Sequence, residues 1–133
     1  MGRGIVGPMR GSSLVREMDE AEAAAVGPNN NRVFVLQRNP HLDYDDARRF
    51  GLLVPVIQRD VFVDDLPSRL DQMKATIEAV LGKFDSSCDY LLLTGDPIAI
   101  FMSGALLRDA GPVKVLKFDR QAGRYYAVEV NFS

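Results

Sequence analysis

Strand patterns recur along the chain from residue 32 onward. Residues 32–37 and 90–94 are apolar on both faces, which predicts inner strands of a sheet that is covered on both sides. Residues 113–118 predict a further strand, and a short loop at 119–123 joins it to residues 124–132 as a hairpin. This last strand alternates from one face to the other, so we expect one-sided burial near an edge of the sheet.

The segment between the first two inner strands is more polar. Residues 41–50 place acids before bases, which predicts a short helical turn capped by Asp43. Residues 52–57 are extended in pattern, but Pro55 cannot donate to a strand ladder, so this strand is expected at an edge or at a strand end. Residues 61–63 predict a further short strand.

Two segments predict the main helices. Residues 66–84 carry apolar side chains at steps of four and three, the spacing of one helical stripe, after an acidic cap at Asp64 and Asp65. Residues 97–110 follow Asp96 as a cap and are apolar nearly all round, so this helix is expected to be buried on most sides.

The first 31 residues differ from the rest and are expected to form a flexible leader. Residues 13–25 fit a short helix with a thin apolar stripe, and residues 26–31 fit a linker. Two alternatives remain open. The segment orders on a partner, or the start codon is wrongly assigned and adds residues ahead of the real domain. Residues 32–133 then form one compact domain with the order β-β-α-β-α-β-β. We therefore predict an α/β fold with a mixed sheet of four to five strands, two main helices and a right-handed parallel crossover.

Composition narrows the classes of protein. The 133 residues carry a net charge of −2, which argues against a protein held on nucleic acid by bulk charge. Cys88 is the single cysteine and His41 the single histidine, so an internal disulfide and a multi-histidine metal site are excluded. No apolar run approaches the roughly 18 residues of a membrane span. No signal peptide opens the chain, so we expect an intracellular protein without membrane contact.

Catalytic chemistry finds little support in the residues. The acids at positions 43–46 lack the spacing and the glycine of a calcium-binding loop. Cys88 has no histidine nearby in sequence, and the serines lack the nucleophile-elbow pattern. We expect no metal, no cofactor and no catalytic residue set, which favours a binding protein over an enzyme.

One candidate ligand site is the corner formed by Thr94, Gly95 and Asp96. Ligands of open α/β sheets bind beyond the carboxyl ends of parallel strands, at helix N-termini. However, Asp96 places a carboxylate where an anion would bind, and Pro97 lacks an N–H. No phosphate-binding glycine motif is present. The corner is therefore either a capped helix entrance or a site for a small ligand or nucleotide.

The second candidate is the last hairpin, where four cations and several aromatic residues are interleaved with one acid. Bases and exposed aromatics at this density fit single-stranded nucleic acid or an acidic protein surface. The simpler alternative is a solvated hairpin whose charges protect a sheet edge. The proposed contact residues are Lys114, Lys117, Arg120, Arg124 and Tyr125.

Two stretches together resemble a group of small uncharacterised proteins encoded by tailed bacteriophages. Residues 89–100 read DYLLLTGDPIAI, and residues 115–130 read VLKFDRQAGRYYAVEV. The group has a D-Y-L-L-x-x-G-D-P segment before a buried helix, and a K-W-D-R-Q-x-x-x-Y-x-P-V-E hairpin. Here Phe118 replaces the usual tryptophan and Ala127 the usual proline. The resemblance covers residues 32–132 and implies a viral accessory protein in the cytoplasm of the infected bacterium, without transferring an activity.

Three functional hypotheses follow. The first is a non-enzymatic module that contacts nucleic acid or a host or phage protein through the basic hairpin. It predicts that Lys117, Arg120 and Arg124 lie exposed and clustered. The second is a small-ligand or nucleotide-binding protein centred on residues 94–97, which predicts a concave pocket reached by Asn39 or His41. The third is a structural or virion component whose leader orders on assembly.

Overall fold

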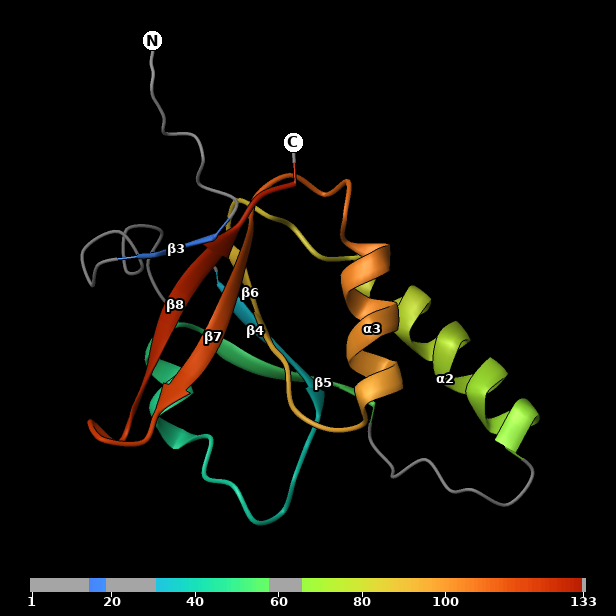
Figure 1. Ribbon diagram of the computed structural model, residues 1–133, viewed down its shortest axis with the longest axis horizontal. Helices are drawn as coiled ribbons and strands as arrows, with labels where there is room; N and C mark the ends of the chain where they lie inside the picture. The colour runs from blue at the N-terminus through green and yellow to red at the C-terminus, as the bar shows by residue number, and fades with distance from the viewer. Residues whose placement is uncertain (1–14, 19–30, 58–65, 133) are drawn as a thin grey trace, which may run out of the picture.

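The computed structural model describes residues 15–18, 31–57 and 66–132 (Figure 1). It confirms the α/β class, with a mixed sheet of six strands in place of the expected four to five. In chain order the elements are β3 (Val15–Glu17), β4 (Arg32–Gln37), the 3-10 helix η1 (Asp45–Arg49), β5 (Leu52–Ile57), α2 (Leu66–Leu81), β6 (Asp89–Leu92), α3 (Pro97–Leu106), β7 (Val113–Asp119) and β8 (Arg124–Val130).

The sheet has the strand order β3-β8-β7-β6-β4-β5. Strands β5, β4, β6 and β7 are parallel to one another. Strand β8 is antiparallel to β7, and β3 is antiparallel to β8. The predicted parallel strand–helix–strand unit is confirmed by β6, α3 and β7. The carboxyl ends of four parallel strands meet at one edge of the sheet, next to the turn that joins β7 to β8 (Figure 1).

Strand β4 lies inside the sheet because both of its faces are apolar. Val33 and Val35 pack into one cluster with η1, while Phe34 and Leu36 pack into another beneath the helices. All four side chains are buried. On the helical side, the predicted stripe of α2 is confirmed by its buried residues, Met73, Ile77 and Leu81.

Two local predictions around β5 are also confirmed. This strand pairs only with β4 among the described strands and forms an edge, as Pro55 requires. The predicted helical turn is η1, but its N-cap residue is Tyr44 and not the predicted Asp43. The Asp43 carboxylate accepts a hydrogen bond from the amide of Asp45 at 2.8 Å. The short strand predicted at residues 61–63 lies outside the described residues.

The predicted helix over residues 13–25 is wrong at Val15–Glu17, which form strand β3. Val15 pairs with Val130, and the Arg16 guanidinium lies 2.9 Å from the Glu129 carboxylate across the two strands. The adjacent Met18 is buried in the core. The exposed edge of β8 offers backbone partners that a short leader helix would leave unpaired. The remaining residues of that predicted helix lie outside the described part, and the domain boundary at residue 32 stays a prediction.

Helix α3 also differs from expectation, because it is buried on one narrow stripe and not on most sides. Ala99 and Ser103 face the interior, while Phe101 is 77% exposed, Ile98 43% and Leu106 40%. The fully buried side chains of α3 are small, Ile100 and Met102 are partly buried, and the other large apolar side chains face outward. A sequence that is apolar all round contains no stripe that would tell these faces apart. None of the helices in the described ranges is long and apolar enough to cross a membrane.

Candidate functional site

The β7–β8 turn is fixed by its own backbone and by Asp119. The Asp119 carboxylate accepts hydrogen bonds from the amides of Gln121 at 2.9 Å and Ala122 at 3.2 Å. Gly123 has a φ of 67°, a left-handed conformation that favours glycine, and its amide donates to the Asp119 carbonyl. The Asp119 carboxylate is therefore bound to backbone amides of the turn.

An aromatic pair supports the hairpin from within. Phe118 lies opposite Tyr125 in register, with ring centroids 5.0 Å apart in an edge-on arrangement. Tyr125 is 4% exposed and Phe118 is 47% exposed. Burial raises the pKa of the Tyr125 phenol, so this ring is a neutral support. The solvent-facing aromatic surface at this point belongs to Phe118.

Helix η1 anchors the hairpin to the rest of the sheet. The Asp46 carboxylate accepts a hydrogen bond from the Tyr125 amide at 2.6 Å, and the Arg49 guanidinium donates to the Tyr125 carbonyl. Arg49 also lies 3.1 Å from the Asp46 carboxylate, and Arg124 lies 4.0 Å from it. These two cations are therefore partly neutralised by η1.

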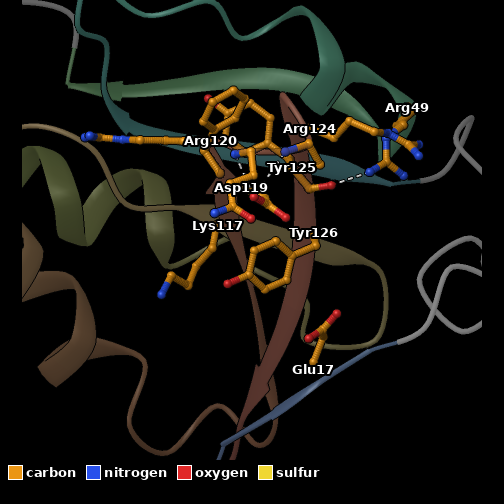
Figure 2. Close-up of a pocket in the computed structure, with 11 residues that line it drawn as sticks. Glu17, Arg49, Lys117, Asp119, Arg120, Arg124, Tyr125 and Tyr126 are labelled. Atoms are coloured by element: carbon orange, nitrogen blue, oxygen red, sulfur yellow. Dashed lines mark hydrogen bonds between the residues drawn. The ribbon is translucent and has the colours of Figure 1, made fainter.

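Lys117, Arg120 and Arg124 are all exposed on the hairpin. Figure 2 shows Lys117 and Arg120 extending to one side of the hairpin, whereas Arg124 lies beside Arg49 on the other. Within the described ranges, Lys117 and Arg120 form no ion pair. The predicted cluster is thus divided into an unpaired group and a group next to Asp46.

Two cavities flank the hairpin. The first, which we call the hairpin cavity, has a volume of about 590 Å³ and is bounded by β7, β8, Arg49 and Glu17 (Figure 2). The second, which we call the strand-end cavity, has a volume of about 550 Å³ and lies at the carboxyl ends of β6 and β7. The side chains that line both cavities are Lys117, Phe118, Arg120 and Tyr125.

The strand-end cavity has mostly apolar walls with few polar groups. Leu42, Leu93 and Phe118 contribute apolar surface, and Thr94 and Asp43 contribute oxygen atoms. Pockets of a few hundred cubic ångströms with apolar walls and a small number of polar groups are typical of ligand sites. Their position beyond parallel strand ends is the usual one for α/β sheets.

The predicted ligand corner itself is filled by protein groups. The Thr94 hydroxyl donates to the Gln37 carbonyl at 2.8 Å, and the Gln37 side-chain oxygen accepts from the Asp96 amide at 2.7 Å. The Asp96 carboxylate caps α3 through the amide of Ile98 at 2.8 Å. A Cβ atom on Gly95 would lie 2.4 Å from the Gln37 side chain. Because Pro97 has no N–H and the Ile98 amide is engaged by Asp96, this helix entrance offers an anion little.

Of the three corner residues, only Thr94 lines a described cavity. The backbone amide of Asn39 donates to the Tyr44 hydroxyl at 2.9 Å, and that hydroxyl lies 3.1 Å from the Thr94 hydroxyl oxygen. His41 lines none of the cavities described here. The corner is thus a hydrogen-bonded helix entrance, and Thr94 is the corner residue that contributes to the wall of the strand-end cavity.

Lys114 is separated from the other hairpin cations because it is buried. Its exposed fraction is 6%, and its ammonium group lies 4.5 Å from the ring centroid of Tyr90 and 3.3 Å from the Ser87 carbonyl. Burial lowers the pKa of Lys114. It belongs to the interior of the sheet, and the predicted contact residue Tyr125 is also buried, so the exposed hairpin surface consists of Lys117, Arg120, Arg124 and Phe118.

Leu42, Asp43 and Arg49 were not predicted at the hairpin. They come from the segment between β4 and β5, and hydrogen bonds to Tyr125 bridge 76–82 positions of the chain. No local pattern indicates such contacts. The acid-before-base order of η1 indicates only the ion pairs within it, Asp45–Arg48 and Asp46–Arg49.

The fold and the site together define a small α/β protein with a mixed sheet and a cationic, aromatic hairpin beside a cavity at the strand ends. A family model described as Phage Pam3 gp32-like protein matches residues 31–132, so the chain belongs to the Phage Pam3 gp32-like family. The expected phage origin is thereby confirmed at the level of the family. No curated protein and no solved structure gives a match.

Proposed function

We propose that this phage protein is a non-enzymatic binding module that acts in the cytoplasm of the infected bacterium and holds single-stranded nucleic acid on its β7–β8 hairpin. The observation that carries the proposal is the position of Lys117 and Arg120, which form no ion pair with any described residue, beside a half-exposed aromatic ring, Phe118. All three border the strand-end cavity.

The cations supply contacts to phosphate. Lys117 and Arg120 are exposed, and within the described part of the chain neither is neutralised by an ion pair. A phosphate backbone gains affinity from such side chains by releasing its counterions, without reading sequence. A local group of this kind acts within a Debye length, so the net charge of −2 does not oppose it.

The aromatic ring and the cavity supply contacts to a base. Phe118 is 47% exposed, and the buried Tyr125 holds its ring edge-on. Stacking of a base on an aromatic side chain contributes about 1–3 kcal/mol and tolerates any base. The strand-end cavity, at about 550 Å³, has room for a base that leaves its stack.

The test is fluorescence anisotropy with a labelled oligothymidylate over a range of salt concentrations. We expect Lys117→Gln/Arg120→Gln to weaken binding and to lower the slope of log affinity against log salt by about 0.7 for each phosphate that is no longer neutralised. Phe118→Ala is expected to weaken binding by about 1–3 kcal/mol with little change in that slope. The matched control is Lys83→Gln/Arg108→Gln, which removes the same charge from exposed positions elsewhere.

Other outcomes reassign the surface. Equal losses in the hairpin variant and in the control would reduce the effect to net charge and contradict the proposal. Polyglutamate competing as well as the oligonucleotide would indicate an acidic protein partner. Thymidine monophosphate binding as tightly as the polymer would indicate the small-ligand alternative at the strand-end cavity.

A further inference from the structure

We infer that the outer face of α3, with the adjoining edge of α2, is an interface between two copies of this chain. Helix α3 contains no charged residue over its 10 positions, and its one hydroxyl, on Ser103, is buried and donates to the Ala99 carbonyl. The outer face is therefore entirely apolar. Its most exposed large side chains are Ile98, Phe101 and Leu106. A contiguous apolar patch of this kind on a soluble domain marks an interaction site.

The patch contains both a projection and a hollow. Phe101 projects from α3 with 77% of its surface exposed. Beside it lies a cavity of about 280 Å³ between α2 and α3, with Ile77, Met102 and Ala105 among its lining residues. A cavity of about 150 Å³ is enough to hold a benzene molecule, so this hollow has room for an aromatic ring.

A two-fold axis matches these two features to each other. In a two-fold interface the same patch meets itself, so a projection in one copy must find its hollow in the other. Phe101 borders the hollow, so the projection and the hollow lie on the same face. The Phe101 side chain of each copy would fill the cavity of its partner, and both copies would bury the same apolar surface.

The charges at the rim have the same self-complementary pattern, and this favours a second copy over a partner of one charge sign. Lys74 and Glu78 form an exposed ion pair at 3.1 Å on α2, and both line the hollow. Across a two-fold axis, Lys74 of one copy faces Glu78 of the other, and the reverse pair forms at the same time. A wholly acidic or wholly basic partner would repel one member of the pair.

The interface leaves the hairpin accessible. Figure 1 shows α2 and α3 side by side on one side of the sheet, with the β7–β8 turn at the opposite lower end of the molecule. The inference is therefore independent of nucleic-acid binding. A dimer would carry two hairpins on one particle, which raises the effective concentration of the second site for a long strand.

Sedimentation velocity of the full chain over a wide concentration range tests the inference. We expect a reversible dimer in the wild type and at least a thirtyfold weaker dimer in Phe101→Asp, as for the removal of a central interface side chain. Ala105→Lys places a long charged side chain in the cavity that would receive Phe101, and it should weaken the dimer to the same extent. Both positions are exposed, so unfolding midpoints are expected to change little.

A charge exchange tests the symmetry. Lys74→Glu and Glu78→Lys alone should each weaken the dimer about fivefold, and the double exchange should restore it. The wild type remaining monomeric at every concentration would overturn the inference. So would a dimer that survives Phe101→Asp and Ala105→Lys, or a double exchange that fails to restore association.

Discussion

Charged side chains lie in different places at the two ends of the parallel strands. At the amino ends, Arg32, Asp89 and Lys114 bring charged groups into the interior or to its border. At the carboxyl ends, the interior holds a neutral network around Gln37 and Thr94, and the cations lie outside on the hairpin. At the first end charged groups join neighbouring strands, whereas at the second the cations lie exposed on the hairpin.

The amino-end network is saturated with hydrogen bonds. The fully buried Asp89 carboxylate accepts from the Arg32 guanidinium at 2.7 and 3.1 Å and from the Asp85 amide at 2.8 Å. The hydrogen bonding to Asp89 raises the pKa of Arg32. Arg32 also donates to the Lys83 carbonyl at 2.7 Å. A charge engaged in this way is structural, and a sequence search for binding cations has to separate it from free ones.

The largest expected effect comes from removing the buried carboxylate. Asp89→Ala leaves the Arg32 guanidinium and the Asp85 amide without their acceptor, and we expect a loss of about 3 kcal/mol in the free energy of unfolding. This is the lower end of the usual range, because the Arg32 side chain is 37% exposed and can hydrate. Urea denaturation measures the loss, with Asp109→Ala as an exposed control. A loss below about 1 kcal/mol would make the two ends equivalent.

The next effect tests how tightly the corner at Thr94, Gly95 and Asp96 is packed. Gly95→Ala places a Cβ atom 2.4 Å from the Gln37 side chain at a φ of 114°, and we expect a loss of about 1–3 kcal/mol. Gly104→Ala is the matched control, because no described atom lies within 4 Å of its Cβ position in α3. That variant should gain about 0.5–1 kcal/mol from helix propensity. Equal effects of the two substitutions would contradict a filled corner.

Lys114 gives a smaller effect that depends on pH. Burial lowers its pKa in the folded state below the ordinary value of 10.5, so between these two values the unfolded chain binds more protons. The stability of the wild type should therefore rise with pH across that interval. Lys114→Met lacks this dependence and should be at least as stable as the wild type at neutral pH, with the difference shifting toward the wild type as pH rises. Urea denaturation from neutral pH to about pH 10 measures this, and a constant difference would contradict it.

The smallest effect is expected at the exposed cations. Lys117→Gln/Arg120→Gln should change the free energy of unfolding by no more than about 0.5 kcal/mol, because neither side chain is part of a described ion pair. Thermal denaturation alongside the binding assay checks this. A loss above about 1 kcal/mol would show that the hairpin cations are structural after all.

The sequence predicted those parts of the fold that depend on local patterns. The strand at Arg32–Gln37 and the stripe of α2 are examples, because their burial is written in the alternation of apolar and polar positions. Strand β3 could not be found in this way. It has three residues, and its contacts with β8 span 113 positions, so only the folded sheet reveals the pairing.

The candidate site was predicted in the same uneven manner. Phe118, Lys117 and Arg120 are local to the hairpin and were found from its composition. Lys114 was grouped with them by charge alone, although strand alternation places it on the same face as the buried Leu116. The sequence does not predict the exposed face of α3, because a helix that is apolar on every side is expected to be buried, and its sequence does not show which neighbour would cover each face.

The pairing of β3 with β8 has a consequence for how the protein is made. During synthesis Val15–Glu17 leave the ribosome early, while their partner residues in β8 come after every other strand of the described sheet. Strand β3 can therefore pair with β8 only after nearly all of the described chain has been translated. Their pairing closes a chain loop that contains all the other described elements. A deletion or insertion near either strand should therefore destabilise the other as well, because the two strands are hydrogen-bonded neighbours in the sheet.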